Sequence, residues 1–294
     1  MEENQLLAEQ FEGHRAHLTA VAYRMLGSLS EAEDAVQESW LRLTRAEGGE
    51  IENLGGFLTT VVARVALDML RSRKSRHEEP LAAPVPELPP GSTPAVDPEH
   101  EALLADSVGL ALLVVLERLA PAERLAFVLH DMFAIPFEEI APIVGRSPAA
   151  ARQLASRARR RVQGPANASG ADLARQREVI DAFLAALRAG DIPGLLAVLD
   201  PDVVVRADAV AARAGAAAEV RGAETWAKQA AAYRGGARFA RPALVEGAVG
   251  AVLAPRGRLF RVLTFTISGG KIVAIEVVGD PARLGQLDLA VLDR

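Results

Sequence analysis

A proline-rich, acidic segment at residues 77–100 separates two helical stretches of this chain. Its sequence, HEEPLAAPVPELPPGSTPAVDPEH, holds seven of the chain's 17 prolines, five acidic residues and no lysine or arginine. Proline fixes φ, lacks an amide hydrogen and breaks helices, so the segment is expected to be extended, with polyproline II character. We therefore predict a linker between two folded parts.

The rest of the chain predicts two helical domains followed by a mixed one. Residues 1–76 and 101–163 show helical periodicity. After a softer break at Gln163–Gly170, a helix at Asp172–Ala189 precedes β-like runs that include Asp202–Arg206, Leu259–Ile267 and Lys271–Val278. The length of 294 residues suits two or three domains. We predict an all-α domain at 1–76, the linker at 77–100, a second all-α domain at 101–163, and an α+β domain at 164–294.

Composition excludes several classes of protein. A chain that is 50% hydrophobic and 24% charged is typical of folded proteins. It has no cysteine, which excludes disulfides and Cys-ligated zinc or iron–sulfur sites and fits a cytoplasmic location. The longest apolar run, Val108–Leu116, is far shorter than the roughly 20 residues of a membrane span, and the acidic N-terminus does not resemble a signal peptide. His14 and His17 lie one helical turn apart without a third ligand, so no metal is expected.

Residues 136–162 have the pattern of a helix-turn-helix. A short helix is expected over Pro136–Gly145, kinked or shortened by Pro142, and a second over Ala149–Val162. Ser147 is a good N-cap for the second helix, and Pro148 suits its first position. Its packed face is predicted to contain the apolar residues Ala151, Leu154, Ala155, Ala158 and Val162.

The opposite face of this second helix has the chemistry of base recognition. It carries Arg152, Gln153, Ser156, Arg157 and Arg160. Arginine suits guanine O6 and N7, and glutamine suits adenine N6 and N7, while Arg159 and Arg161 would meet phosphates. An ordinary helical hairpin with a basic surface would show the same pattern. The net charge of −5 speaks against a nucleic-acid binder, but the basic residues are concentrated late in each helical domain.

Three stretches together carry a family resemblance. They are YRMLGSLSEAEDAVQESWLRL in residues 13–45, NLGGFLTTVVARVALDMLRSRKSR at 53–76, and VLERLAPAERLAFVLHDMFAIPFEEIAPIVGRSPAAARQLASRARRRV in the second helical domain. They resemble regions 2 and 4 of the sigma-70 family, and most closely its extracytoplasmic-function group (group 4). The resemblance covers residues 10–163. It implies a sigma factor that binds core RNA polymerase and directs promoter recognition and transcription initiation, with no catalytic role and no cofactor.

The resemblance also implies which residues bind which partner. The helix at 31–45 would dock on core polymerase through Asp34, Gln37, Glu38, Leu41 and Arg42, although an acidic amphipathic face can also be merely solvated. The helix at 56–73 and its basic end would handle the −10 element of promoter DNA through Arg64, Asp68, Arg71, Arg73 and Lys74. The loop at 46–53 would capture an unstacked base, and the helix at 149–162 would read the −35 element.

The C-terminal domain resembles the SnoaL-like domains of the NTF2-like superfamily. That resemblance implies an α+β cone, with a curved antiparallel sheet around a pocket, which regulates the sigma regions through contacts to the linker and to these regions. Three elements differ from the pattern of sigma factors that carry such a domain. Val85–Pro90 occupies the place where a Trp-Leu-Pro element is expected. Asp208 is followed by AVAARAGA rather than by glycines, and Gly279-Asp280-Pro281 is found in place of Asn-Pro-Asp.

One alternative function remains at the level of the sequence. The chain could be a SnoaL-like enzyme or small-ligand sensor fused to a helix-turn-helix that binds DNA without polymerase. Six residues could then line a pocket: Asp208, Arg213, Trp226, Tyr233, Arg241 and Glu246. The domain has no histidine to serve as a base, and both aromatic residues could simply belong to the core. A free-standing repressor would not need the polar face that runs from Asp34 to Arg42.

Overall fold

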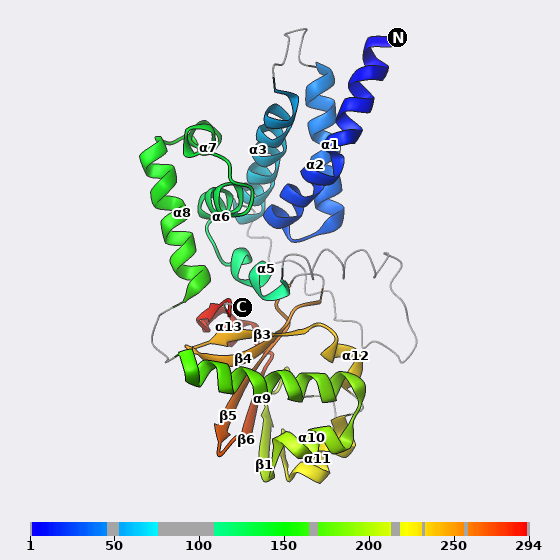
Figure 1. Cartoon of the computed structure of the whole chain (residues 1–294), viewed down its shortest axis with the longest axis vertical. Coiled ribbons are helices and arrows are strands. Elements are labelled where there is room, and N and C mark those ends of the chain that lie inside the picture. Colours follow the sequence, from blue (N-terminus) through cyan, green and yellow to red (C-terminus); the bar gives the residue numbers. More distant parts are fainter. Residues whose placement is uncertain are drawn as a thin grey trace. The chain divides into compact units, whose positions relative to one another are not determined.

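The computed structural model describes residues 2–45, 53–75, 109–164, 170–212, 218–230, 233–255 and 258–292 (Figure 1). The chain divides into two units. Unit 1 comprises Met1–Pro86 and Leu116–Arg160, and unit 2 comprises Glu87–Val115 and Arg161–Arg294. The predicted linker at 77–100 lies outside the described residues.

The first part of unit 1 is a bundle of three helices, α1 (Glu2–Leu26), α2 (Leu29–Arg45) and α3 (Leu54–Ser75). The chain turns sharply between α1 and α2 at Gly27, whose φ of 76° suits glycine. The Asn53 side chain caps α3, because its Oδ1 accepts a hydrogen bond from the Gly56 amide at 2.9 Å. Fully buried apolar side chains hold the bundle together, among them Phe11, Leu18, Met25, Leu58 and Leu67.

The second part of unit 1 includes the end of α5 (Leu110–Glu117), then α6 (Pro121–Phe127), the π-helix η1 (Val128–Met132), α7 (Phe137–Val144) and all but the last three residues of α8 (Pro148–Gln163). Within the unit, α3 packs against α6 and α7, and α1 packs against η1. Ala134, in the segment between η1 and α7, adopts a left-handed conformation with φ of 56°. The helix α7 continues for two residues beyond Pro142.

Unit 2 is built on a seven-stranded sheet of order β2-β1-β6-β5-β4-β3-β7. The strands are β1 (Leu199–Ala207), β2 (Glu219–Arg221), β3 (Ala240–Val245), β4 (Ala248–Leu253), β5 (Arg261–Ser268), β6 (Lys271–Val278) and β7 (Leu289–Ala290). All neighbouring strands are antiparallel except β1 and β6, which are parallel. The sheet is therefore mixed, which corrects the expectation of an antiparallel one, because the chain places β1 directly beside the late strand β6.

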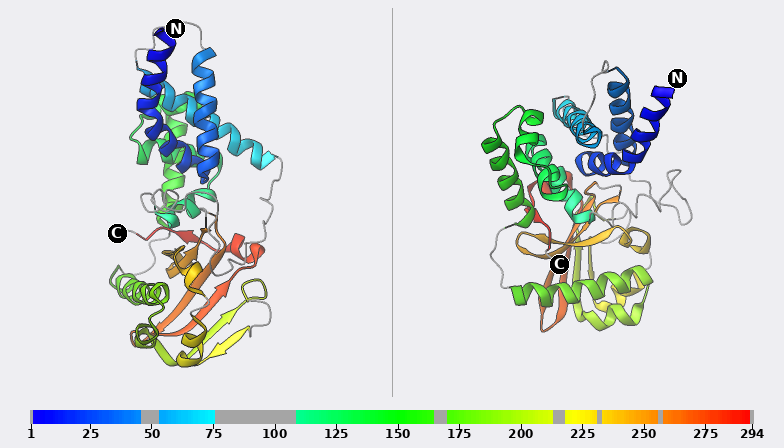
Figure 2. Two further views of the ribbon diagram at one scale, coloured as in Figure 1. Left: turned by 90° about the vertical axis from the view of Figure 1, so that its right-hand side faces the viewer. Right: turned by 45° about the horizontal axis from the view of Figure 1, so that its top comes forward.

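Helices flank this sheet. They are α9 (Gly170–Ala189), α10 (Ile192–Val198), α11 (Ala223–Ala230), α12 (Arg234–Ala237) and α13 (Pro281–Gln286). The long helix α9 packs against β3 and β4, and Figure 2 (left) shows it end-on beside the twisted sheet. Phe183 of α9 lies in the core between Trp226 and Phe265, with both ring-centroid distances 5.5 Å. The predicted class of two helical domains and an α+β domain is confirmed.

Two tight hairpins connect strands of the sheet. Gly269 and Gly270, with φ of 56° and 75°, join β5 to β6, and Ser268 pairs with Lys271 across this two-residue turn. Glu246 and Gly247 join β3 to β4 in the same left-handed region, with φ of 52° and 80°. No helix among the described residues is long and apolar enough to span a membrane.

Candidate nucleic-acid interface

The turn between α7 and α8 forms as the sequence predicts. Gly145 ends α7 in a left-handed conformation with φ of 69°. The Ser147 Oγ accepts a hydrogen bond from the Ala150 amide at 3.3 Å, which caps the start of α8. Pro148 has no amide hydrogen, but amides in the first turn of a helix have no partner within the helix, so α8 begins at Pro148 without losing a hydrogen bond.

The two faces of α8 separate small apolar residues from polar ones. Ala151, Ala155 and Ala158 are fully buried. The residues predicted to read bases lie together on the exposed face: Arg152, Gln153, Ser156, Arg157 and Arg160. Small buried residues let α8 pack closely on its neighbours, so its long side chains extend to the outside.

Three arginines of α8 each contact a side chain from an earlier element of unit 1. The Arg152 guanidinium lies over the Phe137 ring, 5.2 Å from its centroid. Arg157 donates a hydrogen bond from Nε to Glu123 of α6 at 2.8 Å. Arg159 donates from Nε and one terminal nitrogen to Oδ1 of Asp131, at 2.8 and 2.6 Å. The sequence pattern placed these arginines on the correct helix but did not indicate their partners.

The predicted polymerase-binding residues lie along α2. Its buried side includes Ala32, Ala35, Val36 and Leu43. On the other side Asp34, Gln37, Leu41 and Arg42 are exposed and Glu38 is half-buried. Arg42 donates a hydrogen bond to Glu38 at 2.9 Å, one helical turn away. Leu41, 38% exposed, is therefore an apolar side chain within a charged face.

The residues predicted for the −10 element do not all point the same way. Arg64, Asp68 and Arg71 are exposed on α3. Arg73 instead forms an ion pair with Glu31 and donates to the Leu26 carbonyl at the end of α1. The Lys74 side chain and residues 46–52 of the predicted base-capturing loop lie outside the described parts of the structure.

Arg124 is a buried cation that sequence reasoning missed. Its side chain is 3% exposed, and both Nε and a terminal nitrogen donate to the Arg24 carbonyl of α1, at 3.1 and 3.0 Å. Burial lowers the pKa of Arg124 to about 10, so the group is still charged at neutral pH. The carbonyls at the C-terminus of α1 carry partial negative charge, which favours a cation there. Arg124 thus fastens α6 to α1.

Aromatic contacts add to this junction. The Arg24 guanidinium lies 5.1 Å from the centroid of the Phe133 ring, and His17 meets the same ring edge-on at 5.3 Å. His17 Nε2 also lies 3.3 Å from Thr59 Oγ1. Burial and the nearby His14 and Arg24 lower the pKa of His17, so its neutral form is favoured. His17 therefore serves packing between α1, α3 and the segment after η1.

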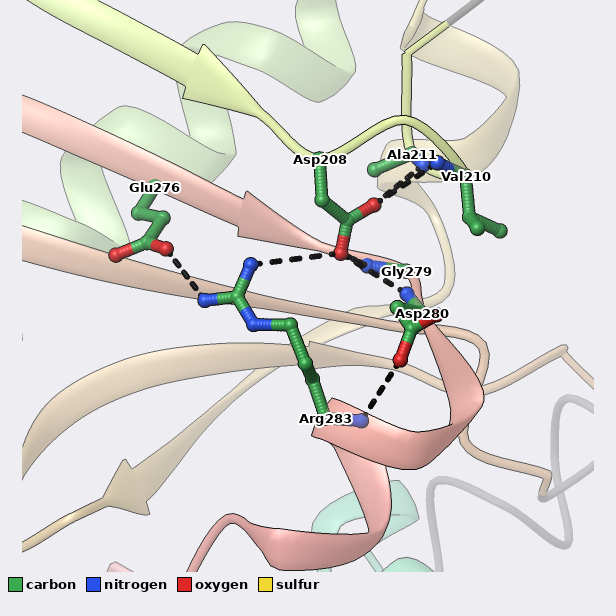
Figure 3. A network of polar contacts seen from close by, with 7 residues as sticks. All are labelled: Asp208, Val210, Ala211, Glu276, Gly279, Asp280 and Arg283. Atoms are coloured by element: carbon green, nitrogen blue, oxygen red, sulfur yellow. Dashed lines mark hydrogen bonds and ion pairs between the residues drawn. The ribbon is translucent and has the colours of Figure 1, made fainter.

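In unit 2, one carboxylate joins two chain segments that are far apart in sequence (Figure 3). Asp208, directly after β1, accepts hydrogen bonds on Oδ1 from the Val210 and Ala211 amides at 3.1 and 2.8 Å. Its Oδ2 accepts from the Gly279 and Asp280 amides at 2.9 and 3.0 Å. These are the two segments that depart from the expected glycine-rich and Asn-Pro-Asp elements, and they lie side by side.

Charge completes the Asp208 network. Arg283 lies 3.7 Å from Asp208 Oδ2 and donates to Glu276 at 2.7 Å, while Asp280 caps α13 by accepting from the Arg283 amide at 2.9 Å (Figure 3). Burial alone would raise the pKa of Asp208, but the four backbone amides outweigh it and hold the pKa below its ordinary value. The carboxylate is a fully engaged structural acceptor.

Four other residues considered for a pocket, Trp226, Tyr233, Arg241 and Glu246, have structural contacts. Trp226 is in the core of unit 2, and Tyr233 is partly buried against that core. Arg241 donates to the Arg238 and Ala240 carbonyls, and Glu246 accepts from the Asp288 amide at 2.6 Å. Arg213 lies outside the described residues.

Comparison with known proteins places these features in a family. Residues 10–76 match the family model of Sigma-70 region 2, and residues 109–162 match that of Sigma-70 region 4. The chain is 37% identical over 290 residues to the "Probable ECF RNA polymerase sigma factor SigI" of Mycobacterium tuberculosis, covering 98% of each protein. The chain belongs to the ECF group of RNA polymerase sigma factors.

A second relative of this ECF sigma factor also matches along most of its length. The "ECF RNA polymerase sigma factor SigJ" of Mycobacterium tuberculosis is 39% identical over 285 residues, covering 92% of this chain and 91% of that protein. The crystal structure of that SigJ covers 95% of this chain and 98% of the solved chain, with 35% identity and a TM-score of 0.45. The sequence matches extend through unit 2, so relatives of this ECF sigma factor share its C-terminal part.

Proposed function

We propose that this ECF sigma factor binds core RNA polymerase, recognises the −10 element through α3 and the −35 element through α8, and is modulated by its C-terminal domain. The observation that carries the proposal is the exposed face of α8, where Arg152 and Arg157 are held by neighbouring side chains. Ordered arginines on a helix of major-groove size are suited to reading base edges. A merely solvated basic face would not need such supports.

The polymerase contact is proposed for the exposed side of α2. Its acidic and amide groups can pair with basic residues of a partner, and Leu41 supplies apolar area at the same place. The mixture of charge with one exposed apolar side chain is typical of the edge of a protein interface. Asp34, Gln37, Glu38 and Arg42 surround Leu41 in this proposal.

On α3 we propose that the exposed Arg64, Asp68 and Arg71 face promoter DNA near the −10 element. Arg73 and Lys74 follow at the basic end of the helix. For Arg73, binding to a phosphate would compete with its ion pair to Glu31. DNA contact at this position therefore requires an exchange of partners.

The C-terminal domain, which we assign to residues 164–294, is proposed to regulate the sigma domains at 1–76 and 101–163 through the linker at 77–100. The relatives that match along the whole chain are sigma factors, which supports a non-catalytic role in the cytoplasm beside RNA polymerase. The enzyme or ligand-sensor alternative is not favoured, because Trp226 is part of the core and Asp208 is occupied by backbone amides.

Run-off transcription tests the proposal. Purified core polymerase with this protein should initiate from a subset of a promoter library, and the selected sequences should share elements near −10 and −35. Core polymerase should also co-elute with the protein. If neither initiation nor co-elution occurs, while DNA binding by the protein alone persists, the alternative of a polymerase-independent DNA-binding protein is correct.

A further inference from the structure

Glu123 is a buried carboxylate whose contact lies on the DNA-facing side of α8. It belongs to the first turn of α6, its side chain is 8% exposed, and it accepts the Nε hydrogen of Arg157 at 2.8 Å. The Arg157 side chain is 46% exposed. A hydrogen bond between a guanidinium and a carboxylate is charge-assisted and stronger than one between neutral groups, which favours the paired position of Arg157. Glu123 therefore restricts where the Arg157 guanidinium can lie.

The hydrogen bond uses one particular donor of the guanidinium. Arginine has five N–H donors in a planar fork, and Glu123 takes the one on Nε. The two terminal nitrogens carry the other four, which is sufficient for a bidentate contact with O6 and N7 of a guanine. Fixing the plane of the fork before DNA binds reduces the rotamer entropy lost on binding.

Arg159 shows the contrasting arrangement. It donates from Nε and a terminal nitrogen to the same oxygen of Asp131, which engages one whole edge of its guanidinium. That geometry suits a structural tie between α8 and η1. Glu123 and Asp131 thus hold two arginines of one helix in different ways. Arg157 uses only Nε in its hydrogen bond to Glu123, whereas Arg159 also uses a terminal nitrogen in its hydrogen bonds to Asp131.

We propose that Glu123 is a positioning residue for promoter recognition, which sets sequence preference at one base of the −35 element by orienting Arg157 without touching DNA itself. This inference rests on the proposed function of α8. It adds a residue from α6, outside the helix-turn-helix, to those that determine specificity.

The test uses full-length variants loaded on core polymerase and promoters with each base at each −35 position. Glu123→Met keeps the side-chain volume and removes the acceptor, whereas Glu123→Gln keeps an oxygen that can still accept from Nε. Glu123→Met should reduce the preference for the favoured base by about tenfold at the position that Arg157→Ala affects. Glu123→Gln should retain most of the preference. Asp131→Ala, the matched control, should leave base preference unchanged.

A double variant separates positioning from general stability. In the Arg157→Ala background, Glu123→Met should cause no further loss of base preference, because its effect passes through Arg157. A uniform loss across all −35 sequences, or an added loss of preference in the double variant, would overturn the inference. A wild-type protein that shows no preference at −35 would overturn both this inference and the proposed function of α8. Preserved preference in Glu123→Met, with Arg157→Ala defective, would overturn the inference alone.

Discussion

Replacing Asp208 by asparagine should destabilise unit 2 almost as much as replacing it by alanine. Each carboxylate oxygen of Asp208 accepts two backbone amides, from Val210 and Ala211 on one side and from Gly279 and Asp280 on the other. Asparagine has one oxygen and one NH₂ group. Whichever way the amide is turned, two N–H donors face another donor.

The size of the effect follows from these two unsatisfied amides. A buried donor left without a partner costs about 1–3 kcal/mol, and the attraction to Arg283, 3.7 Å away, is lost as well. The Asp208 side chain is 12% exposed, so water reaches the site only in part. We expect Asp208→Asn to lower the free energy of unfolding by about 2–4 kcal/mol.

Denaturant unfolding of the full chain, followed by amide hydrogen exchange, measures this prediction. The free energy of unfolding should fall, and exchange should rise at Ala211, Gly279 and Asp280, whereas the amides within β5 should change little. Asp208→Asn with wild-type stability and wild-type protection at Gly279 would show that neither the negative charge nor the second acceptor oxygen is needed at this position. The reasoning about paired acceptors would then be wrong.

Three further predictions concern acid stability, Arg124 and Leu41. The pKa of Asp208 lies below that of an unfolded aspartate, so at this site the folded protein binds fewer protons than the unfolded chain. The stability that this group contributes should be complete above about pH 4 and should decline as the pH falls through the lower pKa of the folded protein. Equilibrium unfolding between about pH 2 and pH 5 should therefore show a shallower loss of stability for Asp208→Asn than for the wild type. Arg124→Ala should reduce the stability of unit 1 by about 2–4 kcal/mol in thermal unfolding, because the Arg24 carbonyl loses two donors and a cavity opens. A loss below about 0.5 kcal/mol would show that water replaces the side chain. Leu41→Glu should change stability by less than about 0.5 kcal/mol but weaken co-elution with core polymerase, and wild-type co-elution would remove Leu41 from the proposed interface.

The parts of this protein that could be predicted from sequence depend on local chemistry. Ser147 and Pro148 act within one helical turn, and their effect on the start of α8 does not depend on the rest of the chain. The alternation of alanine and arginine along α8 likewise determines which side is buried. The glycine pair at 269 and 270 allows the positive φ angles that a two-residue hairpin needs.

The parts that could not be predicted depend on contacts between distant residues. Nothing near Arg124 in sequence indicates that it is buried, because its acceptor is a backbone carbonyl 100 residues earlier. The pairing of Arg73 with Glu31 and of Arg157 with Glu123 has the same origin. A run of arginines on a helix has the same sequence whether each side chain faces solvent or a carboxylate. Only the fold shows which of these two environments an arginine has.

The join made by Asp208 bears on how much the surrounding sequence can drift. Its four hydrogen-bond donors are backbone amides, which almost any residue provides. Besides the nearby charge of Arg283, the side-chain requirements are the carboxylate itself and the absence of a Cβ at Gly279, where an added carbon would lie 3.0 Å from the Ala211 nitrogen. The residues on either side of these two segments can therefore vary while the same architecture is inherited, provided that Asp208 and Gly279 are kept.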